Sequence, residues 1–328
     1  MGKTVTEVVE TPKKNFNAGA LLNRYGTVAI LIAVLIVAAS LSNVFLTERN
    51  IMNVLRQVAG PSLMAVGMLF VILTRGIDLS VGSVAALGSV LSAILIQQYG
   101  TGMAIGGVLL AGAACGLVSG ILVAYLKLPP FVTTLAVMTI ARGLAFIFSS
   151  GQPIMMGEAG SAVTAFGSGT LGSIPYPVLL MIVVFVIAGA VLTFTRFGRL
   201  VKAIGSNSEA VRLSGISVSY YTLSVYVISG VLAAAAGIIS TSRTGIGSAN
   251  ISVGAELDAI AAVVIGGASL MGGRGGAFNT FIGVIILGII ANMMNLARVP
   301  GYHQQVFMGC IIIGAMLLQY ASSWLRKS

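Results

Sequence analysis

The chain has 328 residues, of which 57% are hydrophobic and 8% charged, and its formal net charge is +10. This composition excludes a soluble protein, because too little polar surface is available to face water on all sides, and it predicts an all-α polytopic membrane protein. Most basic residues flank the apolar runs, as membrane topology requires. None of them form a basic patch with interleaved aromatic residues, so no nucleic acid partner is expected.

Residues 1–25 are polar and mixed in charge, which predicts a cytoplasmic N-terminal tail before a transmembrane domain at 26–328. The first apolar run is too long for the core of a signal peptide and lacks a small-residue cleavage site, so it predicts an uncleaved span. About ten spans are expected, with both termini on the same side. Their predicted ranges are 26–46, 51–74, 81–97, 103–126, 131–149, 178–195, 220–240, 256–270, 277–295 and 303–324.

The basic residues predict the orientation of these spans. With a cytoplasmic N-terminus, 13 of the 18 basic residues fall on the inner side, and the five exceptions are Arg49, Arg56, Arg142, Arg243 and Arg298. This bias favours an arrangement with both termini inside. The segment 196–219 is then a cytoplasmic loop, 150–177 is the main external loop, and 241–255 is a second one.

Chemistry in the chain itself is not indicated. Cys115 and Cys310 lie inside apolar runs, where a thiol acts as a small hydrophobe, so neither a disulfide nor a metal site is expected. The single histidine, His303, supports neither a catalytic triad nor a zinc site. The chain has no P-loop, and its G-x-G-x-x-G string at 167–172 lies in a loop. We therefore expect no catalytic residue, no metal and no cofactor bound by this chain.

The segment 196–219, here called the polar island, is a long polar stretch between two apolar runs of the chain. Its charged residues are Arg196, Arg199, Lys202, Glu209 and Arg212. Glycine and N-cap residues predict two short helices, at 200–204 and 208–214, with Gly205 ending the first, Ser206 or Asn207 capping the second and Gly215 closing it. Two readings stay open from these residues alone: a rigid knob that binds a partner, and a positively charged anchor with no partner.

Two packing patterns stand out. Gly112, Gly116 and Gly120 repeat every four residues, which gives a helix face without side chains and lets a neighbouring helix approach closely. The strings at 78–82 and 250–254 echo each other in the two halves, on opposite sides of the membrane in the predicted topology. Such an echo indicates an inverted repeat, a common plan for transport proteins, although chance similarity is an open alternative for both patterns.

Polar residues inside apolar stretches are costly and need a reason. Those that could line a translocation pathway are Asp78, Ser80, Glu256, Asp258, Asn292 and Asn295. Asp78 could instead cap the following span with Arg75 as its charge partner. Glu256 and Asp258 suit the start of a helix but point to opposite faces. The two asparagines share a face and could bind a hydroxylated ligand or a neighbouring helix. Arg142 has no partner visible in the sequence.

The string at 209–215, Glu-Ala-Val-Arg-Leu-Ser-Gly, resembles the EAA-x-x-x-G signature of the coupling loop in permeases of ATP-binding-cassette (ABC) importers. With the residues before and after it, the loop is similar to that of the ribose-type sugar permease family. Strings at 76–82, 256–267 and 269–273 point the same way, and the similarity covers nearly the whole chain. The third signature position is Val211 where the family has alanine, a small apolar change.

This resemblance implies a type II-like ABC importer permease in the bacterial inner membrane, which carries ribose or a related monosaccharide. It implies a homodimer or a pair of permeases, a separate ATPase subunit that uses ATP, and a periplasmic sugar-binding protein. The residues that it assigns to ATPase coupling are Gly205, Asn207, Glu209, Ala210, Arg212, Ser214, Gly215 and Ile216. The alternative is a secondary transporter of a small polar solute driven by an ion gradient, for which convergent pairs of buried carboxylates are expected.

Overall fold

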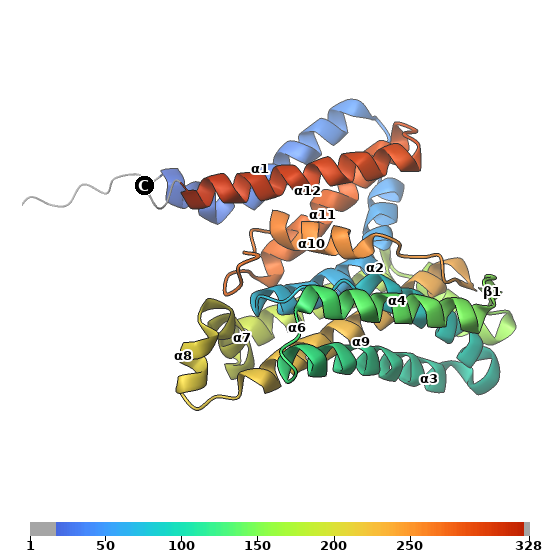
Figure 1. Cartoon of the computed structure of the whole chain (residues 1–328). Helices are drawn as coiled ribbons and strands as arrows, with labels where there is room; N and C mark the ends of the chain where they lie inside the picture. Colours follow the sequence, from blue (N-terminus) through green and yellow to red (C-terminus); the bar gives the residue numbers. More distant parts are fainter. Residues whose placement is uncertain (1–17, 325–328) are drawn as a thin grey trace, which may run out of the picture.

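A computed structural model describes residues 18–324 of the chain, and helices make up most of them (Figure 1). Their bounds are α1 (Ala18–Leu41), α2 (Glu48–Leu73), α3 (Val81–Ala124), α4 (Pro130–Ser149), α5 (Ser161–Ser168), α6 (Tyr176–Phe194), α7 (Arg196–Ser206), α8 (Ser208–Leu213), α9 (Val218–Thr244), α10 (Ala255–Ile265), α11 (Ala277–Leu296) and α12 (Gly301–Trp324). Most of the expected tail and the last four residues lie outside the described residues. Helix α1 already begins eight residues before the predicted first span.

Within the described residues, six helices are long and apolar enough to cross a membrane: α2, α3, α4, α6, α9 and α11. The protein is therefore a multi-pass membrane protein. Helix α3 has 44 residues and covers the span predicted at 81–97 and all but the last two residues of the span predicted at 103–126. Its two arms are joined by a sharp break at Gly100, whose φ of 75° is one that glycine adopts easily.

Helix α10 does not fit the full span expected at 256–270. It has 11 residues, which gives a length of about 16 Å at 1.5 Å per residue, whereas the hydrocarbon core of a bilayer is about 30 Å thick. The helix ends where Gly267 turns the chain with a φ of 80°. Apolar residues continue past that turn, and for this reason composition alone overestimates the length of the helix.

The core is built around α2, α3 and α9, and the glycine stripe predicted on α3 lies at its centre. A methyl group added at Gly112 or Gly116 would collide with the backbone of α9, at Gly230 and Tyr226 respectively. Gly120 continues this contact near Leu223. The close approach of a neighbouring helix is therefore confirmed, and α9 is that helix.

Two non-helical connections lead into helices that begin in the middle of the molecule. We call residues 74–80, which lead into α3, the first connecting segment, and residues 248–254, which lead into α10, the second connecting segment. The second segment touches the start of α3 at Gly82, where an added methyl group would lie 2.5 Å from the Ser252 carbonyl oxygen and 2.6 Å from a Glu256 carboxylate oxygen. The two strings of the sequence echo thus lie side by side.

From this meeting point the two helices diverge. The first arm of α3 runs to the end of α9, where the Ser89 and Thr241 hydroxyls are 2.6 Å apart. Helix α10 runs the other way, to a loop whose Gly273 amide donates to the Leu73 carbonyl oxygen at the end of α2, at 3.0 Å. Opposite directions from one centre are the geometry that an inverted repeat requires.

Short elements cover one end of the bundle. They are strand β1 (Ile154–Met155) paired with β4 (Ile246–Gly247), strand β2 (Thr170–Leu171) paired with β3 (Ile174–Pro175), a 3₁₀ turn at Glu158–Gly160, and α5. Helices α7 and α8 lie at the opposite end (Figure 1). The segment expected as the main external loop is therefore a folded cap, to which the second expected external loop contributes β4.

Candidate functional site

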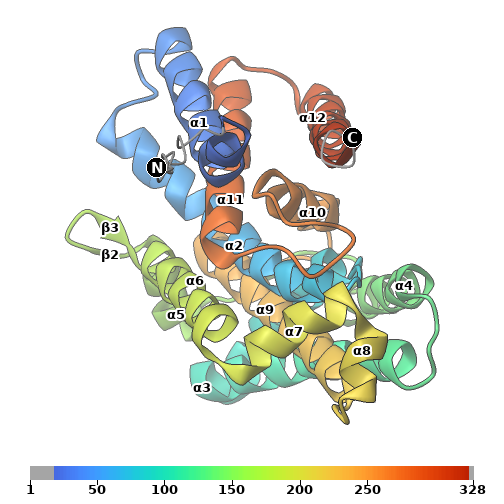
Figure 2. The ribbon, with the colours of Figure 1, turned by 90° about the vertical axis from the view of Figure 1, so that its left-hand side faces the viewer.

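Helices α7 and α8 form the two-helix knob that the polar island predicted, and Figure 2 shows both in front of the ends of α2 and α9. The Thr195 hydroxyl caps α7 by accepting the Gly198 amide at 3.1 Å. Asn207 ends α7 and caps α8, where its side-chain oxygen accepts the Ala210 amide at 3.0 Å. Of the two cap residues that the sequence left open, Asn207 is the one used.

Two details of the first knob helix differ from expectation. The helix begins at Arg196, well before residue 200, and Gly205 lies inside it and does not end it. Gly205 is buried, and a methyl group there would collide with the Leu73 carbonyl oxygen and the Gly273 amide nitrogen. A glycine is therefore required at position 205, because three segments come close together there. The local sequence pattern does not reveal this contact.

The closure of α8 follows the prediction. Gly215 has a left-handed φ of 77°, and its amide donates to the Arg212 carbonyl oxygen at 3.0 Å. The Ser214 hydroxyl donates to the Ala210 carbonyl oxygen at 2.9 Å, and the Ile216 amide donates to Val211 at 3.4 Å. These bonds satisfy the last carbonyls of the helix and fix the exit of the chain. Space around Gly215 is open, so its constraint within this chain is conformational.

The outer face of α8 combines an ion pair with apolar surface. The Arg212 guanidinium donates to both Glu209 carboxylate oxygens, at 2.9 and 2.6 Å, and both side chains are exposed. This hydrogen bond holds the pKa of the Glu209 carboxyl below its usual range. Ala210 is also exposed, and Leu213 is 73% exposed at the end of the helix. Leu213 was missed by sequence reasoning, although an apolar residue in so polar a segment was a usable signal.

Asp78 is the most deeply placed of the candidate pathway residues, and it is 0% exposed. One carboxyl oxygen accepts the Ser80 amide at 3.0 Å and the Ser80 hydroxyl at 2.6 Å. The other accepts the Ser229 hydroxyl of α9 at 2.7 Å. Arg75 is not its charge partner, because the Arg75 guanidinium binds backbone carbonyls elsewhere. In this structure Asp78 and Ser80 fix the first connecting segment to α9.

The two acids of α10 lie apart, as their spacing predicted. The Glu256 carboxylate faces Gly82 where the starts of α3 and α10 meet. Asp258 lines a cavity of about 150 Å³ between α2, α10, α11 and α12, together with Gln57 and Met308. The candidate acids therefore do not form a convergent pair.

The two asparagines of α11 also separate. Asn292 is buried and forms a reciprocal amide pair with Asn50 of α2, with two hydrogen bonds of 3.0 Å. Asn295 is exposed and accepts the Gln304 amide at 2.9 Å. The predicted shared face does not gather them at one ligand site. Asn292 joins two helices, which is the second of the roles left open by the sequence.

Arg142 has partners that the sequence could not show. Its guanidinium donates from α4 to the Ala249 and Ile251 carbonyl oxygens, at 2.6 and 2.8 Å, and to the Ser83 hydroxyl at 3.2 Å. These acceptors belong to the second connecting segment and to the start of α3. Every residue has a backbone carbonyl, so the sequence does not show which carbonyls will accept a hydrogen bond. The sequence therefore showed only an arginine inside an apolar run.

Across the part of the chain that the structure describes, no group of three or more His, Cys, Asp or Glu side chains is arranged to hold a metal ion. The arrangement instead consists of an exposed two-helix knob at one end, a folded cap at the other, and the starts of α3 and α10, which meet between them.

Comparisons with known proteins agree with this arrangement. The family model described as "Branched-chain amino acid transport system / permease component" matches residues 50–316. The ribose import permease protein RbsC of Bacillus subtilis is 40% identical over 319 residues, which covers 97% of this chain and 99% of that protein. RbsC of Escherichia coli K12 is 40% identical over 309 residues, covering 93% of this chain and 96% of that protein.

A third relative is the D-allose transport system permease protein AlsC of Escherichia coli K12, which is 38% identical over 311 residues and covers 93% of this chain and 94% of its own length. No solved structure matches the chain. The family match and the relatives confirm the resemblance inferred from the motifs. The chain belongs to the family of branched-chain amino acid transport system permease components, among relatives that include ribose import permeases.

Proposed function

We propose that this protein is the membrane-spanning permease subunit of an ABC importer that carries a monosaccharide, ribose or a related sugar, across the bacterial inner membrane. The observation that carries the proposal is the α7–α8 knob. It displays the 209–215 signature on an exposed helix that is capped at both ends, at one end of the bundle. A mere connection between two spans requires no such rigid, exposed structure.

ATP is bound and hydrolysed by a separate ATPase subunit that holds the knob. The exposed surface of Ala210 and Leu213 is suited to a cleft, and the Glu209–Arg212 pair can rearrange to bind polar groups of the ATPase. Closure of two ATPase subunits would then rock the helices of the permease. A second copy of this chain completes the assembly and forms the pathway between the two copies.

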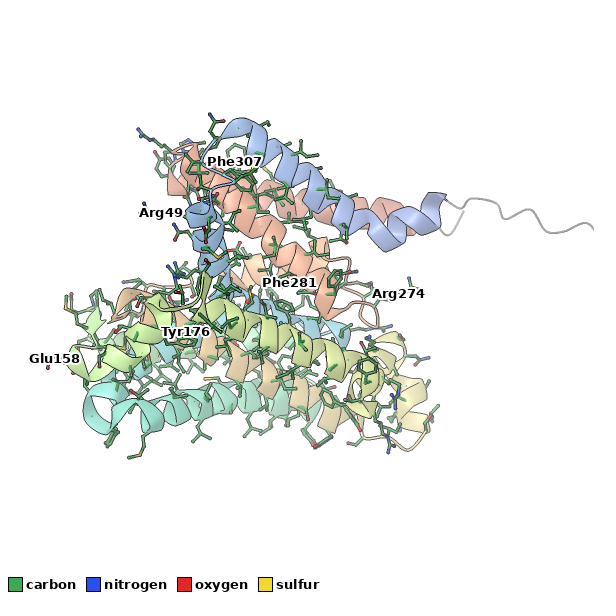
Figure 3. All side chains as sticks on the ribbon, turned by 180° about the vertical axis from the view of Figure 1, so that it is seen from behind. Arg49, Glu158, Tyr176, Arg274, Phe281 and Phe307 are labelled. Carbon is green, nitrogen blue, oxygen red and sulfur yellow. The ribbon has the colours of Figure 1, made fainter. Side chains whose placement is uncertain are left out.

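Both termini face the cytoplasm in this proposal, and a periplasmic sugar-binding protein docks on the cap. Figure 3 shows Glu158 of the cap and Arg274 at opposite ends of the bundle, which supports this orientation because cations favour the inner side. A cysteine at Ser161 is expected to react with an impermeant thiol reagent in intact cells, and one at Ser208 only after the membrane is opened. The reverse pattern would contradict the orientation.

The alternative is an ion-driven secondary transporter. It calls for buried carboxylates that converge on one site, and here Asp78 is bound by three hydrogen bonds while Glu256 and Asp258 face different surroundings. It also gives no reason for the knob. We therefore favour the ATP-driven importer.

The knob is tested by replacing Gly215. A bulky residue at a φ of 77° costs about 1–2 kcal/mol in the left-handed region and places a side chain on the docking face. The Gly215→Trp permease is expected to insert normally but to lose co-purification with the ATPase and to lose uptake. Gly215→Asn is the matched control, because asparagine tolerates this conformation. Normal co-purification and uptake in Gly215→Trp would refute the assignment of the knob.

A further inference from the structure

The Arg75 side chain joins three segments that are distant in sequence. Its Nε donates to the Gly205 carbonyl oxygen at 2.6 Å and to the Met271 carbonyl oxygen at 2.8 Å. Its Nη2 donates to the Ser206 carbonyl oxygen at 2.8 Å. One guanidinium at the start of the first connecting segment, just after α2, thus holds the end of α7 and the loop between α10 and α11.

These contacts are suited to a charged donor. The last carbonyls of a helix have no partner within the helix, and the partial negative charge there favours a cation. Gly205 and Ser206 supply such carbonyls at the end of α7. Hydrogen bonds from a charged group are roughly twice as strong as those between neutral groups. Arg75 itself has a left-handed φ of 66°, which marks this place as one where the surroundings dictate the backbone.

The backbones around Arg75 touch directly. The Gly273 amide donates to the Leu73 carbonyl oxygen at 3.0 Å, and a methyl group at Gly205 would collide with that same oxygen. A methyl group at Gly272 would lie 2.5 Å from the Arg75 Cγ. The three segments are therefore in direct contact, so that a shift of one would disturb its contacts with the other two.

These contacts lead to both connecting segments. Three residues after Arg75, the Asp78 carboxyl ties the first connecting segment to α9. The loop at 269–274 continues backwards into α10, whose other end is the second connecting segment. At the start of α7 the contact with the core is apolar, because the Phe197 ring packs against Phe70 and Tyr221. Ring packing is less directional than the hydrogen bonds of Arg75, so it does not fix one position of α7.

We propose that Arg75 is a positioning residue that transmits movement of the α7–α8 knob to both connecting segments, and so couples ATP hydrolysis to opening of the sugar pathway. This inference rests on the proposed function, because only a permease driven through its knob requires such a link. Arg75 acts at a distance and touches neither ATP nor sugar.

The experiment uses the complete complex of permease, ATPase and sugar-loaded binding protein in proteoliposomes, with radiolabelled ribose as the probe. Sugar uptake and ATP hydrolysis are measured together for wild type and Arg75→Gln. We expect Arg75→Gln to co-purify with the ATPase in normal amounts and to hydrolyse ATP, while uptake per ATP falls about tenfold or more, since the charge-assisted bonds are lost. Arg75→Lys keeps the charge and one donor group, and is expected to be intermediate.

Lys127→Gln is the matched control, because it removes the same charge outside the knob, from a residue between α3 and α4 that also has a left-handed φ, of 56°, and whose amine donates to the Ser219 hydroxyl at 3.2 Å. Its uptake per ATP should equal that of wild type. Wild-type coupling in Arg75→Gln would overturn the proposal, and so would loss of ATPase binding, which would give Arg75 a merely structural role. If too little Arg75→Gln protein is recovered from the membrane, Arg75→Lys is measured in its place. Uptake per ATP equal to wild type in Arg75→Lys would then overturn the proposal. Absence of ATP-dependent uptake in wild type would instead refute the proposed function.

Discussion

The two connecting segments come together near Gly82, at the start of α3, yet they are held in place by different chemistry. The first carries its own anchor, the Asp78 carboxyl, which is buried and bound to Ser80 and Ser229. The second has no buried carboxyl of this kind: its Ser248 amide donates to the Ser89 hydroxyl of α3 at 3.2 Å, and the half-buried Arg142 of α4 binds two of its carbonyl oxygens. The first segment is therefore fixed to α9 by a buried carboxyl, while the second is held through its own backbone groups by α3 and α4.

The difference indicates which half is better placed to move. The half with α2, α3 and α9 is locked by backbone contacts at glycines and by the Asp78 bonds. Helices α10 and α12 lie on the other side of α2 (Figure 2), next to the cavity that Asp258 lines. Proteins that alternate between states keep one part rigid and move another against it. We therefore expect the second connecting segment to shift further than the first when the knob moves.

The largest effect is expected from removing the internal anchor. Asp78→Ala leaves three buried donors without an acceptor, at a cost on the order of 3 kcal/mol or more. The thermal unfolding midpoint of the purified permease should fall strongly, and its amount in the membrane should drop. Asp78→Asn keeps an acceptor oxygen and should retain both stability and substantial uptake. Equal stability of the alanine and asparagine variants would contradict the anchoring role.

A smaller and more local effect is expected at Arg142. Arg142→Gln removes charged donors from two carbonyl oxygens, each bond contributing about 1.5–3 kcal/mol. Hydrogen exchange of the backbone amides in 248–254 should accelerate, while exchange in 74–80 should stay as in wild type. Arg142→Lys, which keeps the charge, should lie between the two. Equal acceleration in both segments would mean that the two anchors are not independent.

The smallest effect is expected at the amide pair between α2 and α11, which lies outside both connecting segments. Asn292→Ala leaves Asn50 without its partner and should lower the free energy of unfolding by about 1 kcal/mol, the scale measured for polar contacts between membrane helices. Asn295→Ala is the control, because that side chain is exposed and should cost less. If Asn292→Ala lowered the free energy of unfolding as much as Asp78→Ala does, the expected order of the two effects would be wrong.

Local chemistry was enough to predict the knob from the sequence. Gly215 signals the closure of α8 by its residue type and was placed correctly, while Asn207 is one of the two cap residues that the sequence left open. Gly205 was misread as a helix stop. Position 205 needs a glycine because it contacts Leu73, which is more than a hundred residues away in the sequence. The sequence could not show the partners of Arg75 and Arg142 for a similar reason: both bind backbone carbonyls, which leave no pattern in the sequence.

The membrane helices show the same limit. Apolar composition predicted most of them, but it could not show that α10 is a half-helix, because apolar residues continue beyond Gly267. The candidate pathway residues were chosen for their polarity inside apolar runs. The structure distributes them among a core anchor, a helix pair, an exposed contact, the meeting point and a cavity.

The most direct test of the central claim is sugar uptake by proteoliposomes that contain this permease, with ATP supplied on the side of the knob. We predict that uptake of radiolabelled ribose or a related monosaccharide requires the ATPase subunit, ATP and the binding protein together, and that an uncoupler at constant ATP changes it little. Uptake that proceeds without the ATPase and collapses with the uncoupler would contradict the account and favour an ion-driven transporter.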